Sequence, residues 1–227
     1  MPARDLDFNV DSDVLALGVR GIYFVAADIG NRESDPEFEA MRDEVVAAVA
    51  RTPLDPAADP ILAGFRQLHE RVHCSNRKFV SSPENLHSLV ARTKTLPHVN
   101  LLVDVYNLVS LQTRLALGAH DVDRIDGDVH LRLTRGDERF VPLGSSEPKP
   151  VRAGEYGYVD DANDVICRLE VRQVEKTKVT TATKHCFFIV QGNAGTDAEY
   201  LASSAQKLIA LLRQFCGGTI RMLYEWQ

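Results

Sequence analysis

The 227-residue chain has the composition of a globular protein, 44% hydrophobic and 26% charged, and its length suits one domain with one continuous core. No apolar run reaches the roughly 18 to 20 residues that span a bilayer, and the acidic N-terminal segment is unlike a secretory signal. A net charge of −6 argues against bulk nucleic-acid binding, and four scattered cysteines have no disulfide or zinc-ribbon spacing. We therefore expect a cytoplasmic protein with reduced thiols.

The first half of the chain predicts one strand and then a series of helices. Residues 19–30 are a dense apolar run with β-formers, which is typical of a buried strand. Apolar spacing and start signals predict helices at 36–51, 60–73, 82–93 and 96–118. Pro60 suits the first position of the second helix, and Ser82 is the candidate N-cap of the third.

The second half changes to strands separated by Gly, Pro, Asp and Asn turn signals. Strands are predicted at 129–135, 139–144, 164–173, 184–192 and 219–226, with one amphipathic helix at 197–215 before the last of them. Helices gathered before strands indicate an α+β fold with a mainly antiparallel sheet and helices packed around it. We expect residues 1–227 to form a single domain.

The segment HERVH places His69 and His73 four residues apart with Glu70 between them, which is the spacing of zinc metallopeptidases. A catalytic zinc site needs a third protein ligand, but the position six residues after His73 is Phe79. Arg71 would also place a cation between the two ligands of a dication. A metal-free surface helix that contacts an anion is therefore the favoured interpretation, and a zinc hydrolase remains a remote alternative.

Two polar groups interrupt the apolar helix predicted at 96–118. Asp104 and Asn107 lie three residues apart, and a buried carboxylate is costly unless it has a specific partner. For Asp104 we favour a structural role in anchoring a loop. For Asn107, whose amide both donates and accepts, an equally good interpretation is the polar wall of a ligand pocket.

Charged residues alternate with apolar ones after residue 167, at Glu170, Arg172, Glu175, Lys176 and Lys178. Such alternation is typical of a solvent-exposed strand face, but it also fits a site for a carboxylate, a phosphate or a positioned water.

A second group of charges lies between residues 64 and 98, where bases outnumber acids although the chain is acidic. This basic segment comprises Arg66, Arg71, Arg77, Lys78, Arg92 and Lys94.

Several segments, taken in order, resemble the B3/B4 domain, the tRNA-editing module in the β subunit of bacterial-type phenylalanyl-tRNA synthetase. They are NLLVDVYNLVSL (100–111), HDVDRIDGDVHLR (120–132) and FVPLG (140–144). The later segments GEYGYVDD (154–161), VICRLEVRQ (165–173) and TKVTTAT (177–183) look like the free-standing branch of that family. The resemblance covers roughly residues 60 to 192.

This resemblance implies hydrolysis of the ester that joins a wrong amino acid to the 3′ end of a tRNA, without a metal or other cofactor. Carried over by position, it assigns catalytic roles to Asn107, His120 and Thr183. It assigns substrate contacts to Asp104, Glu170, Arg172, Lys178 and Gln191. The basic segment would then contact the tRNA backbone. The chain departs from the synthetase pattern at Gly118, where the synthetase module carries a histidine.

Two other functions stay open at this point. Gly118 favours a non-catalytic module that binds tRNA or an amino acid with the same fold, and the HERVH spacing leaves the zinc hydrolase as a remote possibility. No partner other than tRNA is expected, no membrane association is expected, and the oligomeric state is open. Which amino acid and which tRNA would be substrates is also open.

Overall fold

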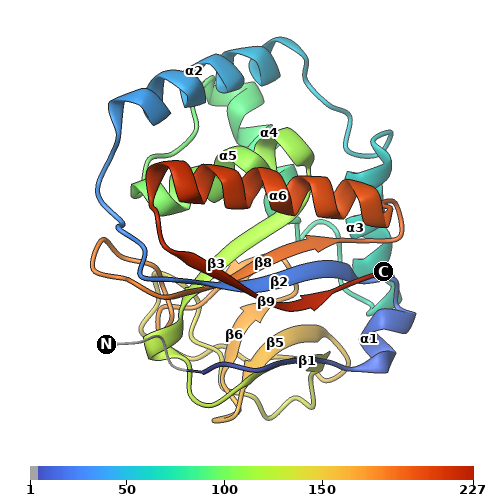
Figure 1. Cartoon of the computed structure of the whole chain (residues 1–227). Helices are drawn as coiled ribbons and strands as arrows, with labels where there is room; N and C mark the ends of the chain where they lie inside the picture. The colour runs from blue at the N-terminus through green and yellow to red at the C-terminus, as the bar shows by residue number, and fades with distance from the viewer. Residues whose placement is uncertain (1–4) are drawn as a thin grey trace.

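A computed structural model describes residues 5–227, which form a single α+β domain of three layers (Figure 1). Two sheets lie face to face, and the larger helices cover the outer face of one of them. This arrangement confirms the predicted fold class. No helix in the described part of the chain is long and apolar enough to cross a membrane.

The middle layer is a four-stranded antiparallel sheet with the order β3-β8-β2-β9. Its strands are β2 (Arg20–Ala27), β3 (Ala116–Asp121), β8 (Cys186–Gly192) and β9 (Thr219–Glu225). Every residue of β3 and β8 is buried, because helices cover one face of this sheet and the second sheet covers the other. Strands covered on both faces have continuous apolar sequences rather than alternating ones, which is why the sequence of β2 is readily recognised as a buried strand.

The outer sheet has five short strands in the order β1-β4-β5-β6-β7. They are β1 (Phe8–Val10), β4 (Val129–Leu133), β5 (Tyr156–Asp160), β6 (Val165–Arg168) and β7 (Arg172–Gln173). β1 pairs with β4 in parallel, and the other pairs are antiparallel. The sheet is therefore mainly antiparallel, as the grouping of strands in the second half of the sequence predicted.

Aromatic rings from both sheets form the core between them. Tyr23 of β2 lies 4.2 Å from Phe8 of β1 and 6.0 Å from Tyr158 of β5, measured between ring centroids. Phe187 of β8 lies 5.3 Å from Phe8. Ring pairs at such separations contribute about 0.5 to 1.5 kcal/mol each beyond their burial, so these contacts fix the spacing of the two sheets.

The helices are α1 (Ser12–Ala16), α2 (Pro36–Arg51), α3 (Pro60–Arg71), α4 (Ser82–Thr93), α5 (Leu101–Thr113) and α6 (Ala198–Phe215), with a short 3-10 turn, η1 (Val122–Arg124). α5 and α6 pack on the middle sheet, and α2 lies above them (Figure 1). Asp35 and Asp59 accept hydrogen bonds from the first backbone N–H groups of α2 and α3, each followed by proline. These caps explain why the starts of both helices were predictable.

Three predicted elements differ from the structure. The helix predicted at 96–118 begins at Leu101 and ends at Thr113, and β3 follows after Arg114, whose φ of 61° closes the helix. The strand predicted at 139–144 forms only isolated bridges. The strand predicted at 164–173 is interrupted between β6 and β7 by a turn with Leu169 at a φ of 53°.

The predicted N-cap of α4 was also wrong. Ser81 takes the cap position, without a side-chain cap bond, and Ser82 is the first helical residue. Pro83 then follows at the second position of the helix, which a proline tolerates because the N–H there has no partner within the helix. The helix itself covers residues 82–93 as predicted.

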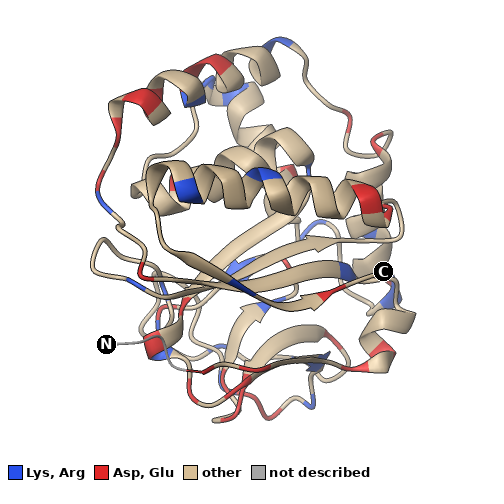
Figure 2. Ribbon diagram, in the orientation of Figure 1, with Lys and Arg blue, Asp and Glu red and all other residues tan. Residues whose placement is uncertain are grey.

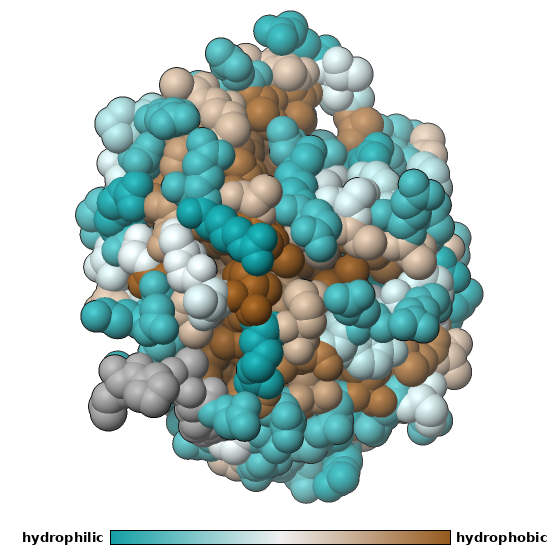
Figure 3. Space-filling model, in the orientation of Figure 1, coloured by the Kyte–Doolittle hydropathy of each residue, from teal (hydrophilic) through white to brown (hydrophobic). Residues whose placement is uncertain are grey.

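Charge and apolar surface are mixed on the face that presents α6 and β9. Figure 2 shows lysine and arginine positions scattered among acidic ones through the fold rather than in a continuous band. Figure 3 shows polar side chains around an apolar strip near the centre of the same face. β9 is one of the two edge strands of the middle sheet, and its exposed side chains include Arg221 and Glu225, which discourage pairing with another chain.

Candidate functional site

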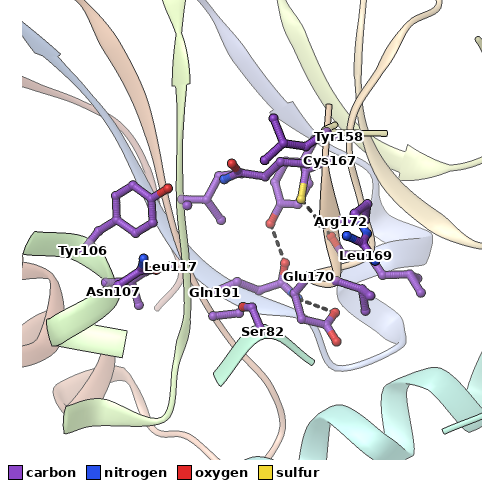
Figure 4. A pocket seen from close by; sticks show the side chains of 16 residues that line it. Ser82, Tyr106, Asn107, Leu117, Tyr158, Cys167, Leu169, Glu170, Arg172 and Gln191 are labelled. Carbon is purple, nitrogen blue, oxygen red and sulfur yellow. Dashed lines mark hydrogen bonds between the residues drawn. The ribbon is translucent and has the colours of Figure 1, made fainter. Parts of the chain in front are cut away.

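A cavity of about 220 Å³ lies between the two sheets, beneath the start of α4 and beside α5. Its walls come from seven separate helices and strands and from the loops between them, so no local stretch of sequence encodes it. Figure 4 shows Tyr106 and Asn107 of α5 on one side and Glu170 and Gln191 on the other. Leu117, Leu169 and Ile189 supply apolar wall. An apolar pocket with a few convergent polar groups is the usual form of a small-molecule site.

A buried hydrogen-bond network centres on Glu170. Its Oε1 lies 2.5 Å from Nε2 of His69, and its Oε2 accepts a hydrogen bond from the hydroxyl of Tyr156. Gln191 donates to the same carboxylate across 3.5 Å and accepts from Tyr158 at 2.6 Å. Because buried polar groups are costly unless every one is bonded, this network holds the carboxylate of Glu170 in one position in the cavity wall.

The two histidines of HERVH do not share a helix face. α3 ends at Arg71, and His73 lies beyond it with a φ of 55° and an exposed side chain. His69 is buried, with Nδ1 facing Asn76 at 3.1 Å and Nε2 facing Glu170. The zinc interpretation needs both imidazoles on one ion, and this geometry separates them. His69 instead supports a carboxylate of the cavity.

The histidine that supports Glu170 carries a proton more readily than usual. Burial favours the neutral imidazole, but the charge and hydrogen bond of Glu170 outweigh it and raise the pKa of His69 above its ordinary value of 6.5. The side chains of the pair are 1% and 2% exposed, so water screens their attraction little. The pair therefore favours the protonated imidazole of His69.

Gln173 fills the space next to Gly118. A Cβ atom added at Gly118 would lie 2.7 Å from Nε2 of Gln173, which is closer than such atoms come in folded proteins. Gln173 also lies beside Tyr106, and all three residues line the cavity. Glycine at position 118 therefore lets an amide from β7 occupy the place that a side chain on β3 would take.

This packing predicts that Gly118→Ala lowers the unfolding free energy by about 1 kcal/mol, the low end of the cost of overpacking, because the contacting atom is the end of a flexible side chain. Gln173→Ala should remove the clash, so the double variant should be more stable than the sum of the single changes by more than about 0.5 kcal/mol. Urea unfolding of the four proteins measures this coupling. Gly30→Ala is the matched control, because its added Cβ would have only an ordinary contact at 3.6 Å. Strictly additive effects would contradict the contact.

The cavity also contains a thiol, but it is not poised as a nucleophile. Burial, followed by the nearby Glu170 charge, raises the pKa of Cys167 far above its usual range, and its Sγ donates to the Leu169 carbonyl at 3.3 Å. Because only the thiolate attacks readily, the cavity offers no activated cysteine. All four cysteines are free and buried.

The residues assigned by resemblance divide into two groups. Asn107, Glu170, Arg172 and Gln191 line the cavity, on three different elements and a turn. The remaining assigned residues lie elsewhere. They are Asp104, His120, Lys178 and Thr183.

His120 is fully buried outside the cavity lining. Its Nδ1 lies 2.8 Å from the hydroxyl of Thr177, and burial lowers the pKa of His120 to about 3. It shares a face of β3 with Gly118 by the two-residue period, but only Gly118 lines the cavity. A neutral imidazole outside the cavity has no access to a reacting ester, so we do not retain it as an acting group.

The other three residues make structural contacts. Asp104 accepts from the Val99 N–H at 3.0 Å and lies 2.5 Å from Nδ1 of His98, so it anchors the loop before α5. Thr183 donates to Asp121 at 2.8 Å. Lys178 pairs with Glu175 at the surface. None of the three lines the cavity. The contacts of Asp104 agree with the loop-anchoring role that its sequence position suggested.

The basic segment is partly neutralised. Arg66 makes a two-point contact with Glu84, at 3.0 and 2.6 Å, and Arg71 donates to the Leu17 carbonyl. Arg77, Lys78, Arg92 and Lys94 are exposed. The sequence suggested six cations free to contact RNA, whereas Arg66 and Arg71 are engaged within the protein.

Several residues of the site escaped sequence reasoning. Tyr106 and Gln173 line the cavity, and His69 and Tyr156 hold Glu170 from behind. The only signal in the sequence was His69 within HERVH, which pointed to metal binding. Its contact with Glu170 joins residues 101 positions apart, so no local pattern could reveal it.

Comparison with known proteins places this site in a family. The family model described as the B3/4 domain matches residues 69–217. The β subunit of phenylalanine–tRNA ligase from Mycoplasma genitalium is 31% identical over 117 residues, which are 51% of this chain and 14% of that protein. The subunit from Fusobacterium nucleatum is 23% identical over 168 residues, 64% of this chain and 21% of its own length.

The fold agrees with a solved structure. An N-terminal fragment of the phenylalanyl-tRNA synthetase β subunit from Pyrococcus horikoshii superimposes with a TM-score of 0.52 at 16% identity, covering 96% of this chain and 51% of the fragment. That similarity concerns the fold alone. The chain spans only about a fifth or less of its curated relatives. Because the family model covers well over half of the sequence and includes the cavity, the chain belongs to the B3/4 domain family.

Proposed function

We propose that this protein hydrolyses the ester of a mischarged aminoacyl-tRNA, with the amino acid held in the cavity between the sheets. The observation that carries the proposal is the convergence of Asn107, Glu170, Arg172 and Gln191 on one small cavity. By the resemblance, Asn107 corresponds to an asparagine of the editing module, and Glu170 and Arg172 correspond to a polar pair of its free-standing relatives. Gln191 falls near a glutamate of the module. Membership of the B3/4 family and relatives named as phenylalanine–tRNA ligase subunits support a tRNA-related role.

The polar groups of the cavity suit an ester of an amino acid. A carboxylate offers about four acceptor positions, and the neighbours of Glu170 use three of them, so one remains for the α-ammonium group. The amide of Asn107 and the guanidinium of Arg172 are donors for the ester carbonyl, whose oxygen gains negative charge as the carbonyl becomes tetrahedral. Apolar wall from Leu117 and Ile189 receives the side chain.

The reaction needs little beyond positioning. The oxygen of a water molecule bonds to the ester carbon, the bond from that carbon to the ribose oxygen breaks, and the ribose oxygen takes up a proton. The products are the free amino acid and a tRNA with its hydroxyl restored. Holding water and ester in contact removes much of the entropic barrier, and donors to the oxyanion lower the remainder.

Deacylation of a panel of mischarged tRNAs by the purified protein tests the proposal. Asn107→Ala and Arg172→Ala should each lower the rate by about 10-fold to 100-fold, somewhat less than the loss of an oxyanion donor in an established hydrolase. Gln206→Ala, on the exposed face of α6 away from the cavity, should leave it unchanged. Circular dichroism should show all three variants folded. A wild-type rate equal to the buffer blank for every tRNA would defeat the enzymatic function.

One observation favours a second function, a module of the same fold that binds tRNA or an amino acid without hydrolysis. Both oxygens of Glu170 are engaged by neighbours, and the family histidine is replaced by Gly118, so no side chain lining the cavity is an unengaged base. Such a module would keep its affinity for tRNA without turnover. Its affinity should fall steeply with salt, because phosphate contacts release counterions.

A further inference from the structure

A second hollow of about 350 Å³ adjoins the cavity and shares three lining residues with it, Leu143, Val171 and Arg172. We call it the basic groove. Its other walls include Lys78, Phe79, Phe140, Lys149 and Arg168. A ligand in the cavity that continued beyond Arg172 would enter this groove.

The lining of the basic groove contains four cations and no acidic residue, although the chain as a whole carries a net charge of −6. Glu155 binds Arg168 through two hydrogen bonds, at 2.6 and 2.8 Å. Lys78, Lys149 and Arg172 are exposed, and none of them makes an ion pair with an acid in the described part of the chain. Three cations without local neutralisation create a positive potential that attracts an anion.

Flat groups line the same groove. The guanidinium of Arg168 lies 4.9 Å from the ring centre of Phe79 and 5.6 Å from that of Phe140. The pair with Glu155 fixes this stack, so the planar groups are already ordered before any ligand arrives. Aromatic rings and arginine planes beside backbone-binding cations are the combination that binds unpaired nucleotides.

The apolar side chain at the border is exposed. Leu143 is 43% exposed, yet its backbone N–H donates to the Gln173 carbonyl at 2.9 Å, so the loop that carries it is fixed to β7. A rigid, exposed leucine between the cavity and the basic groove suits a ligand in which a polar bond joins two parts that each have an apolar surface. An amino acid esterified to a nucleotide is such a ligand.

We propose that the basic groove binds the unpaired 3′-terminal nucleotides of an RNA whose esterified amino acid lies in the cavity. Lys78 and Lys149 contact phosphates, the Phe79–Arg168 stack contacts a base, and Arg172 lies at the ester. This inference rests on the proposed function and identifies its RNA contact surface. Of the basic segment, Lys78 alone lines this groove, whereas Lys149, Arg168 and Arg172 lie outside that segment in sequence.

Fluorescence anisotropy with a short unpaired RNA that carries no amino acid tests the groove. The charge reversals Lys78→Glu and Lys149→Glu together should weaken binding by about tenfold or more and lower the salt slope by about 1.4, since each phosphate contact on a single strand contributes about 0.7. Lys207→Glu with Arg213→Glu, on the exposed face of α6, is the control with the same change in net charge. That control should retain at least half of the wild-type affinity.

A second variant tests the stack. Phe79→Leu keeps an apolar side chain but removes the ring, and it should weaken RNA binding by about fivefold, the low end of the contribution of a stacked base. Polyphosphate has no bases, so its affinity should be the same for Phe79→Leu as for wild type. If polyphosphate binds as well as RNA and Phe79→Leu affects neither, the groove is a general anion site and the proposal is overturned.

The two proposals fail separately. The binding assay uses RNA without an ester, so it reports on the groove even if no deacylation occurs. Suppose that Asn107→Ala abolishes deacylation, and that the Lys78→Glu, Lys149→Glu protein binds RNA as well as its α6 control does. The proposed function then stands and the groove assignment is wrong. A duplex RNA that binds more tightly than the unpaired strand would also overturn the assignment.

Discussion

Lys176→Met is expected to lower the free energy of unfolding by about 3 kcal/mol, the low end of the cost of breaking a buried pair. The ammonium of Lys176 lies 2.7 Å from carboxylate oxygens of Asp126 and Asp160 and 2.8 Å from one of Asp164. The side chain of Asp160 is fully buried, so the variant would leave like charges together without a cation. The melting temperature should fall by roughly 6 to 12 °C for a chain of this length.

The pH dependence of this contribution follows from the same contacts. Burial opposes the charged lysine, but hydrogen bonds to three carboxylates outweigh it and raise the pKa of Lys176 above its ordinary value. A raised lysine pKa gives stability that is fully present below about 10.4 and lost only as the pH rises through the higher folded value. The difference between wild type and variant should therefore persist unchanged across the neutral range.

Lys178→Met is the matched control, since this lysine lies two residues further on and its pair with Glu175 is exposed. It should change the stability by less than about 0.5 kcal/mol. One oxygen from each of the three carboxylates lies within 4.8 Å of the other two, so removal of the ammonium leaves these like charges close together. Equal losses in both lysine variants would contradict the role of the cluster.

Elements with start and stop signals were predictable from the sequence, and elements without them were not. α2 and α3 begin with an aspartate that caps the helix and a proline after it, so their starts match the prediction. Residues 101–117 contain no glycine or proline, and the chain passes from buried helix to buried strand at Arg114. A buried helix and a strand covered on both faces are both continuous apolar runs, so periodicity cannot separate them.

The candidate site was predictable only in part, for a related reason. Asn107 stood out because an amide in an apolar helix requires an explanation. The strand predicted through residue 170 would expose Glu170, yet the turn at Leu169 directs it into the interior. Tyr106 of α5 and Gln173 of β7 meet because the helix and the outer sheet come together at the cavity, and Gly118 matters because it leaves space for Gln173. Such contacts depend on tertiary packing, which no local pattern records.

His69→Ala is expected to lower the unfolding free energy by about 3 to 5 kcal/mol, because it leaves the buried carboxylate of Glu170 without its cation. The side chains of both partners are almost completely buried, and Tyr156 and Gln191 supply only neutral donors. His69→Gln retains an uncharged donor in a similar place and should therefore lose less. Urea unfolding measures both variants against wild type.

The pH dependence separates an ion pair from a neutral hydrogen bond. Because the folded pKa of His69 is raised above 6.5, its charge contributes stability that is fully present below about 6.5 and lost as the pH rises through the folded value. The stability difference between wild type and His69→Gln should therefore be largest near pH 6 and shrink in alkaline solution. A difference that grew with pH would mean that the imidazole is neutral in the folded protein.

His73→Asn is the control from the same HERVH segment. His73 is exposed with a φ of 55°, a conformation that asparagine tolerates, so the change should cost less than about 0.5 kcal/mol. If HERVH bound zinc, both histidines would be essential to any activity. If its role is to support Glu170, only His69 is essential. If His69→Gln weakens ligand binding in the cavity while His73→Asn leaves it unchanged, HERVH acts through the carboxylate that it holds in the cavity wall.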